Sequence, residues 1–176
     1  MSVVYDFDTQ LQWSNGHAPH GVETILRNRI PDCVAVVRAD ADHDRNGTDH
    51  WAVRPDPLPP LSIDLKARAE DWAPRGDDDL ALETWSVIGQ KLGWTRDTSK
   101  RTDYILWYWA DTKRFCILPF HPLCRMFRLH MDEWCATYKV CRQDSGLWRS
   151  ECVFVPRMVV QEAVWRWQNG CLKKAV

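Results

Sequence analysis

Asp49, the triplet Asp64-Leu65-Lys66 and Glu83 bring three carboxylates and one ammonium group into one stretch of this chain. Two or three carboxylates that meet at the edge of a small sheet make an oxygen-ligand site for Mg²⁺ or Mn²⁺. On a strand, Lys66 points to the same face as Asp64, because successive side chains alternate between faces. The spacing therefore predicts a metal ion and a fixed positive charge side by side, an arrangement suited to cutting a phosphodiester.

Each residue of this set has an expected role. Asp49 and Asp64 are predicted to ligate the metal, and Glu83 to complete its ligand shell directly or through water. A hard cation there polarises the scissile phosphate and lowers the pKa of a bound water. Lys66 is predicted to hold the attacking water or to stabilise charge on the phosphate oxygens. The alternative for any one of these carboxylates is an ordinary solvated surface group.

The elements that must position these residues follow from hydrophobic spacing and from turn and proline signals. Apolar residues at helical spacing predict helices over residues 21–30, 123–134 and 156–170. Short apolar or alternating runs predict strands over residues 3–5, 33–37, 48–53, 61–67, 80–87, 104–109, 115–120 and 153–155. Turns are expected at 14–16 and 46–47, polar acidic stretches at 39–47 and 70–79, and a stiff proline-rich connection over 55–60.

This order of elements predicts an α/β (α+β) protein with a central mixed β-sheet flanked by helices. A chain of 176 residues is expected to form a single domain, residues 1–176. Its core is predicted to span about residues 20–125, followed by a helical and basic C-terminal extension over about residues 123–176.

The order helix, acidic strand, (D/E)-x-K strand and acidic strand resembles the PD-(D/E)xK nuclease superfamily over roughly residues 20–125. The matching residues are Asp49 as the first acid, Asp64-Leu65-Lys66 as the (D/E)-x-K element and Glu83 as the later acid. In that superfamily an acid on the first helix sometimes joins the site, and Glu23 is the auxiliary residue in that place here. The resemblance implies a restriction-endonuclease-like core and hydrolysis of DNA phosphodiesters that depends on Mg²⁺ (or Mn²⁺).

Three features of the chain depart from the pattern of that superfamily. Thr48, not proline, precedes Asp49, and Asp64 stands where Glu is commoner. The proline-rich connection over residues 55–60 lengthens the link between the two strands that carry these acids.

The two halves of the chain carry opposite charge, although the formal net charge of the whole is -1. Residues 1–87 hold 8 Lys and Arg against 16 Asp and Glu, and residues 88–176 hold 15 against 8. This asymmetry favours an acidic half that binds cations and a basic half that meets a polyanion; two solvated faces that attract each other are the alternative. Candidate contacts with nucleic-acid phosphates are Lys91, Arg96, Lys100 and Arg101.

Two other groups of residues admit a functional interpretation. Four tryptophans are suited either to stack on exposed bases or to pack the core: Trp85, Trp94, Trp107 and Trp109. A zinc site is conceivable at His121, Cys124, His130 and Cys135, and a calcium loop at residues 40–47. The zinc spacing matches no known pattern and the loop lacks the later bidentate Glu, so buried thiols, a satisfied histidine and a solvated turn explain these residues better.

Seven scattered cysteines without a CxxC pair favour reduced thiols in a cytoplasmic protein over a disulfide framework. No apolar run is long enough to predict a membrane span, and the acidic N-terminus is not expected to form a signal peptide. The expected partner is DNA, and a homodimer stays open because many enzymes that cut both strands act as dimers. The alternative function is a non-catalytic module on the same core that binds nucleic acid or an acidic protein.

Overall fold

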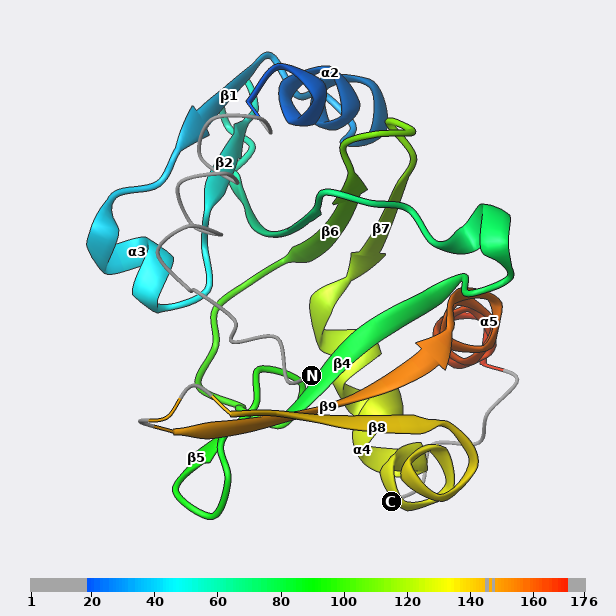
Figure 1. Cartoon of the computed structure of the whole chain (residues 1–176). Helices are drawn as coiled ribbons and strands as arrows, with labels where there is room; N and C mark the ends of the chain where they lie inside the picture. The colour runs from blue at the N-terminus through cyan, green and yellow to red at the C-terminus, as the bar shows by residue number, and fades with distance from the viewer. Residues whose placement is uncertain (1–18, 145, 147, 171–176) are drawn as a thin grey trace. The chain divides into compact units, whose positions relative to one another are not determined.

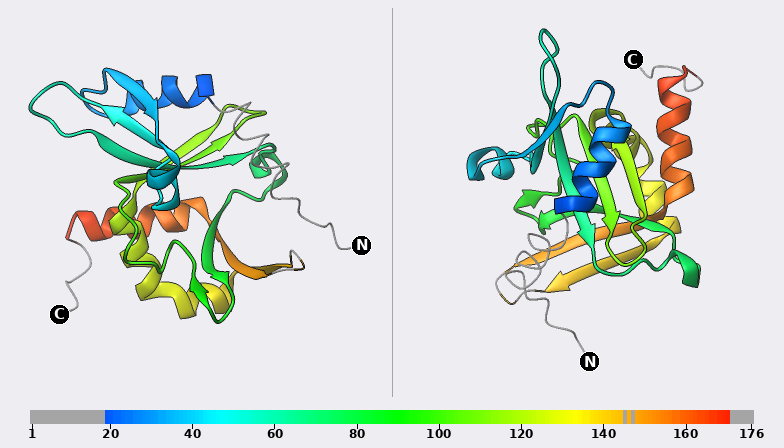
Figure 2. Two further views of the ribbon diagram at one scale, coloured as in Figure 1. Left: turned by 90° about the vertical axis from the view of Figure 1, so that its left-hand side faces the viewer. Right: turned by 90° about the horizontal axis from the view of Figure 1, so that it is seen from above.

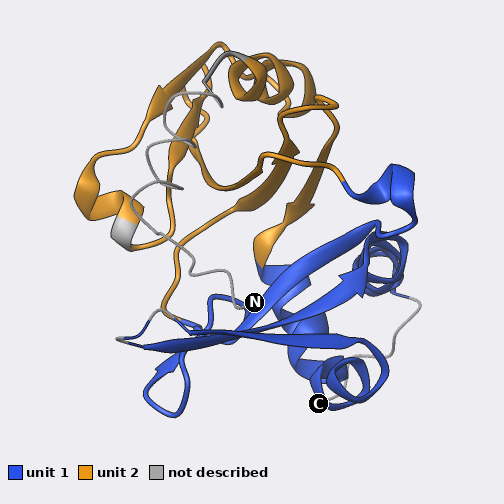
Figure 3. Cartoon of the chain, viewed as in Figure 1, with its two compact units in different colours: residues 1–6, 72–98, 121–176 blue, residues 7–71, 99–120 orange. Residues whose placement is uncertain are grey.

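The computed structural model describes residues 19–144, 146 and 148–170, so the strand expected at 3–5 and the turn at 14–16 lie outside the described residues. The chain forms two compact units, each assembled from segments that are distant in sequence (Figure 3). Among the described residues, unit 1 contains residues 72–98 and those from 121 onward, and unit 2 contains those up to 71 together with 99–120. Residues 72–98 thus group with the C-terminal segment, whereas the sequence predicts that they belong to the core of about residues 20–125.

Unit 2 is built on a five-stranded mixed sheet. Its strands are β1 (Ala35–Arg38), β2 (His50–Val53), β3 (Leu61–Arg68), β6 (Tyr104–Trp109) and β7 (Phe115–Pro119), and they are adjacent in that order (Figure 1). The first three strands form an antiparallel meander, β6 runs parallel to β3, and β7 is antiparallel to β6. The parallel pair arises because the segment of unit 1 between β3 and β6 carries the chain back to the same end of the sheet.

Helix α2 (Pro19–Arg29) covers one face of this sheet, as Figure 2 shows. Its Val22 and Leu26 are fully buried in a cluster with Ile63, Leu106 and Tyr108 of the sheet. A Cβ atom at Gly21 would overlap the Tyr108 ring, so glycine allows the helix to approach β6 closely. The helix therefore packs against the face of β3 that carries Ile63, and the alternate side chains of β3 point to the other face.

Unit 1 contains a four-stranded antiparallel sheet. Its strands are β5 (Lys91–Leu92), β4 (Asp79–Val87), β9 (Arg149–Pro156) and β8 (Lys139–Asp144), adjacent in that order. Leu80 and Leu82 of β4 are fully buried opposite Val155 and Val153 of β9. These central strands carry the apolar residues, whereas β8 is an edge strand whose side chains are mostly exposed.

Helices α4 (Phe120–Thr137) and α5 (Arg157–Gln168) complete unit 1, together with the short 3₁₀ turn η1 (Ala73–Arg75). The buried residues of α4 recur at helical spacing and form one apolar stripe: Leu123, Met126, Phe127 and Trp134. Helix α5 buries Val160 and Val164, and its first residue, Arg157, pairs with Asp78 at 2.7 Å before β4. None of the described helices is both long enough and apolar enough to cross a membrane.

The predicted class, α+β with a mixed sheet flanked by helices, is confirmed, and the expected helices and strands of the described residues are present. The acidic stretch at 39–47 differs, because it contains the short helix α3 (Ala41–Arg45). Asp40 caps this helix by accepting hydrogen bonds from the backbone N–H groups of Asp42 and His43, a local effect that outweighs the polar composition. Strand β8 was not expected, because an exposed edge strand lacks the apolar alternation that marks a half-buried one.

Candidate functional site

Asp49 lies at the end of the β2–β3 pairing, directly after a turn. Gly47 in that turn has a φ of 94°, a conformation that glycine adopts without strain. The Asp49 N–H donates to the Ile63 carbonyl at 2.8 Å, and the Asp49 carboxylate accepts from the Leu65 N–H at 2.6 Å. The Asp49 carboxylate thus accepts the hydrogen bond from Leu65, the middle residue of the Asp64-Leu65-Lys66 triplet, in place of a backbone carbonyl. These bonds fix the first acid of the predicted set against the second.

Asp64 and Lys66 form an ion pair on one face of β3. The Lys66 Nζ to Asp64 Oδ1 distance is 2.7 Å, and the side chains are 28% and 8% exposed, respectively. They lie in register with Ile105 and Trp107 of the parallel strand β6, both of which are buried. The face is opposite to the one covered by α2, so the core packing of Ile63 and Leu65 determines where the charged pair points.

The two aspartates are close enough to affect each other's ionisation. Burial and the negative charge of Asp64 raise the pKa of Asp49 to about 7, although the Lys66 ammonium and the Leu65 N–H oppose this rise. Asp44 on α3 adds a smaller upward effect on the same pKa. A carboxyl that is half protonated at neutral pH is an unusual group, because carboxyls ordinarily titrate near pH 4. Asp44 is a neighbour of the site that the sequence pattern does not assign to it.

The donor set is suited to a hard divalent cation. Two carboxylates and one ammonium leave a net negative charge in a half-buried place, and the raised pKa of Asp49 reflects its burial first and the repulsion from Asp64 second. A cation bound between the carboxylates would relieve that repulsion, and oxygen ligands are those that Mg²⁺ and Mn²⁺ prefer. Within the described ranges, no group of three or more His, Cys, Asp or Glu side chains is arranged to hold a metal ion, and the candidate donor pair is Asp49 and Asp64.

The loop before β6 is joined to the loop before Asp49 by several hydrogen bonds. The Arg101 N–H donates to the Asn46 carbonyl at 3.4 Å, and the Thr48 hydroxyl donates to the Arg101 carbonyl at 3.3 Å. The hydroxyl of the buried Thr102 donates to the Gly47 carbonyl at 2.5 Å. These contacts bring Lys100 and the exposed Arg101, two of the predicted phosphate contacts, next to the turn that carries Asp49.

Glu83 is not on a strand adjacent to β3. It lies on β4, which pairs with β5 and β9 in unit 1, whereas the neighbours of β3 are β2 and β6. Its carboxylate accepts hydrogen bonds from the Ser86 hydroxyl at 2.8 Å and from the Trp94 N–H at 3.0 Å. The expectation that β4 follows β3 in one sheet is therefore wrong, because the apolar residues of β4 pair with β9 instead.

Three other predicted residues lie outside the elements that carry the aspartate pair. Glu23 pairs with Arg27 on the exposed side of α2, the helix that covers the opposite face of the sheet. Lys91 is exposed on β5 in unit 1. The guanidinium of Arg96 stacks over the Trp85 ring at 4.4 Å and donates to the Thr84 carbonyl at 3.3 Å, so local structure already accounts for this side chain.

The remaining sequence candidates have structural explanations. Trp94, Trp107 and Trp109 are buried, which agrees with core packing. His121, Cys124, His130 and Cys135 all lie on α4, where Cys124 is buried and His130 stacks on Trp134 at a centroid distance of 5.4 Å. The acidic stretch proposed as a calcium loop is the capped helix α3.

His50, which follows Asp49, is a feature that sequence spacing does not reveal. Its Nδ1 atom is buried without a hydrogen-bond partner, and burial together with the charge of Arg38 lowers its pKa. His50 pairs with Ile63 across β2 and β3, so it faces the α2 side of the sheet and not the aspartate pair. Comparison of the chain with family models, with curated proteins and with solved structures finds no match.

Proposed function

We propose that this protein is a divalent-metal-dependent nuclease that hydrolyses phosphodiester bonds of DNA. The observation that carries the proposal is the cluster of Asp49, Asp64 and Lys66, in which a 2.7 Å ion pair lies beside a carboxyl whose pKa is raised to about 7. Strongly perturbed carboxyls next to a specific charge partner are typical of functional sites.

The resemblance to the PD-(D/E)xK superfamily supports the same proposal through the order of elements in unit 2. Helix α2, the strand that follows Asp49 and the strand with Asp64-Leu65-Lys66 occur in the expected order, and the two strands pair side by side. Glu83 departs from the expected set, because its strand belongs to the sheet of unit 1. The proposed catalytic set is accordingly Asp49, Asp64 and Lys66, on a restriction-endonuclease-like core formed by unit 2.

Asp49, Asp64 and Lys66 have different proposed roles. Asp49 and Asp64 would hold the cation, Mg²⁺ or Mn²⁺, which when bound polarises the scissile phosphate and lowers the pKa of a coordinated water. The Lys66 ammonium, only 28% exposed, stabilises negative charge that develops on the phosphate oxygens. Asp49 must lose its proton before it can serve as a ligand, so binding of the cation and loss of that proton are linked.

The test is cleavage of linear and circular DNA by Asp64→Ala and Lys66→Ala, with Mg²⁺ and with Mn²⁺. Each substitution is expected to lower the metal-dependent cleavage rate by a factor of about 10²–10³ or more, because each removes a group that acts on the reacting phosphate. Circular dichroism and thermal unfolding establish that the variants stay folded. Isothermal titration calorimetry with Mn²⁺ distinguishes the roles of the two residues. Asp64→Ala is expected to lose Mn²⁺ binding, and Lys66→Ala is expected to retain it.

Glu23→Ala is a matched control, because Glu23 is an exposed acid of the same unit that pairs with a neighbour on its own helix. It is expected to retain wild-type cleavage and Mn²⁺ affinity. Cleavage that is unchanged in both Asp64→Ala and Lys66→Ala would remove the proposal. DNA binding that weakens with salt, without any Mn²⁺ site, would favour a non-catalytic nucleic-acid-binding module instead.

Lys100 and Arg101 are proposed to contact the phosphates of the substrate, because their loop is bonded to the turn before Asp49. The double variant Lys100→Ala/Arg101→Ala is expected to weaken DNA binding and to reduce the slope of log K against log salt concentration by about two. Fluorescence anisotropy with a labelled duplex at several salt concentrations measures both quantities. Arg27→Ala, on the helix that covers the opposite face of the same sheet, is the control, and an effect of Arg27 equal to that of the double variant would contradict this placement of the DNA.

A further inference from the structure

Cys141 and Cys152 lie directly opposite each other in the sheet of unit 1. Cys141 is on the edge strand β8, Cys152 is on β9, and the antiparallel register pairs them. Both are half-buried, and neither is in a disulfide in this structure. Side chains that are directly opposite on antiparallel strands point to the same face, so the two sulfur atoms lie on one side of the sheet.

The spacing of such a pair is compatible with a disulfide. Directly opposed residues of antiparallel strands have Cα atoms about 4.5–5.5 Å apart, and disulfides span Cα distances of about 4.4–6.8 Å. The register around the two cysteines is held by neighbouring pairs on both sides, Val140 with Val153 and Arg142 with Glu151. The second of these pairs also forms an ion pair of 2.8 Å, so the strands cannot slip without losing it.

The other described cysteines lack this arrangement. Cys116 is buried and is paired with Trp107 across β6 and β7, and Cys124 is buried on α4. Burial raises the pKa of both Cys33 and Cys135, and a higher pKa lowers the fraction of reactive thiolate. Cys141, in contrast, is on the outermost strand of its sheet, where a small oxidant can approach from the free edge.

We propose that Cys141 and Cys152 form a reversible disulfide when the protein meets a peroxide. The Cys141 thiolate attacks one peroxide oxygen, the O–O bond breaks, and a sulfenic acid and hydroxide are formed. The Cys152 thiolate then attacks the sulfenic sulfur, the S–S bond forms, and a second hydroxide leaves. The two thiol protons neutralise the two hydroxides, so two thiols and one hydrogen peroxide give one disulfide and two waters. A dithiol reductant reverses the change by thiol–disulfide exchange.

The test treats the full chain with hydrogen peroxide, blocks the remaining thiols with N-ethylmaleimide and maps tryptic peptides without reduction. Cleavage after Lys139, Arg142, Arg149 and Arg157 leaves the two thiols in separate peptides, residues 140–142 and 150–157. The expected product is these two peptides joined by a disulfide that dithiothreitol removes. The intact disulfide is also expected to raise the melting temperature, because it closes a short loop in the unfolded chain.

Variants in which one cysteine is replaced by serine identify the thiol that reacts with peroxide and the thiol that resolves the sulfenic acid. In Cys152→Ser the sulfenic acid on Cys141 has no resolving partner, so dimedone is expected to label peptide 140–142. In Cys141→Ser the linked peptide and the rise in melting temperature are both expected to disappear, whereas Cys135→Ser, the control from α4, is expected to keep both. Joining of either peptide to one containing Cys135 or Cys171 instead, or oxidation of both cysteines to sulfinic acid without a linked product, would overturn the proposal. The test does not measure cleavage of DNA, so its outcome is independent of the proposed nuclease activity.

Discussion

The variant Asp49→Asn is expected to be more stable than the wild type at pH 8, by about 1–3 kcal/mol, in the absence of metal. Burial and the charge of Asp64 raise the pKa of Asp49 to about 7 from an ordinary value of 3.8. Asparagine removes the charge that this environment disfavours, and its side-chain oxygen can still accept the hydrogen bond from the Leu65 N–H. A substitution that removes a proposed metal ligand should therefore strengthen the fold.

The pH dependence follows from the direction of this shift. Because the pKa of Asp49 is higher in the folded protein than in the unfolded chain, the folded state holds a proton between about pH 4 and pH 7 that the unfolded state has released. The stability contributed by this group is fully present below about pH 4 and is lost as the pH rises through about 7. The stability advantage of Asp49→Asn is thus expected to be smaller at pH 5 than at pH 8.

Urea unfolding at pH 5 and pH 8, with and without Mn²⁺, measures these differences. The wild type is expected to gain stability with Mn²⁺ at pH 8 by mass action, and its Mn²⁺ affinity is expected to rise with pH up to about 7 as the Asp49 proton is lost. Asp49→Asn is expected to gain nothing from Mn²⁺. A variant that is less stable than the wild type at pH 8 would mean that Asp49 serves as a structural acceptor for Leu65 and not as a strained ligand.

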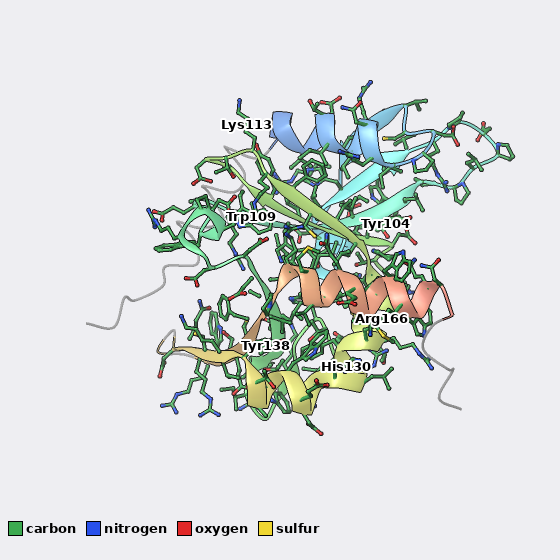
Figure 4. All side chains as sticks on the ribbon, turned by 90° about the vertical axis from the view of Figure 1, so that its right-hand side faces the viewer. Tyr104, Trp109, Lys113, His130, Tyr138 and Arg166 are labelled. Carbon is green, nitrogen blue, oxygen red and sulfur yellow. The ribbon has the colours of Figure 1, made fainter. Side chains whose placement is uncertain are left out.

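The second large effect is expected at Asp71, whose substitution by alanine should destabilise unit 2 by about 3 kcal/mol or more. The Asp71 side chain is 1% exposed and is held by the Arg114 guanidinium through bonds of 2.6 and 2.7 Å. The Thr112 hydroxyl donates to the same carboxylate at 2.8 Å, and Arg114 stacks over Trp109 at 4.2 Å. These contacts join the segment after β3 to the β6–β7 turn, which follows Trp109 and includes Lys113, both labelled in Figure 4.

Removal of the Asp71 carboxylate leaves the Arg114 charge without its partner in a place that water reaches poorly, and this accounts for the cost. Thermal and urea unfolding measure the loss. The double variant Asp71→Ala/Arg114→Leu is expected to recover part of the stability, because it no longer contains an unpaired charge. Glu23→Ala, which breaks an exposed ion pair of the same unit, should change the free energy of unfolding by less than about 0.5 kcal/mol. Equal losses for Asp71→Ala and Glu23→Ala would contradict the importance given to burial.

Local patterns in the sequence were sufficient for most individual elements. The β-branched and aromatic run from Tyr104 to Trp109 is a strand with the predicted bounds, and the apolar spacing of α2 and α4 identified both helices. These elements are predictable because each depends on side chains close together in the chain. Helix α3 was missed because its stability depends on one capping aspartate rather than on an apolar face.

The candidate site was predictable only in part, for the same reason. Asp64 and Lys66 share a face by strand periodicity alone, and the chain order of the strands favours the nearby position of Asp49. In sequence, Arg101 is 53 residues from Thr48, and only hydrogen bonds formed in the folded unit bring the loop of Lys100 and Arg101 to the turn before Asp49. Glu83 was assigned to the same sheet because strand pairing cannot be derived from the composition of a single strand.

The amino-acid sequence by itself determined the types and faces of the charged residues on β3, the location of the main helices and strands, and the α+β class. The tertiary structure decided that β4 pairs with β9 and not with β3, that the Asp49 carboxylate is bonded to Leu65 beside the Asp64–Lys66 ion pair, and that Cys141 faces Cys152. The physical reason is that alternation and helical spacing depend on the covalent geometry of neighbouring residues, whereas pairing and burial depend on the competition among all strands for partners.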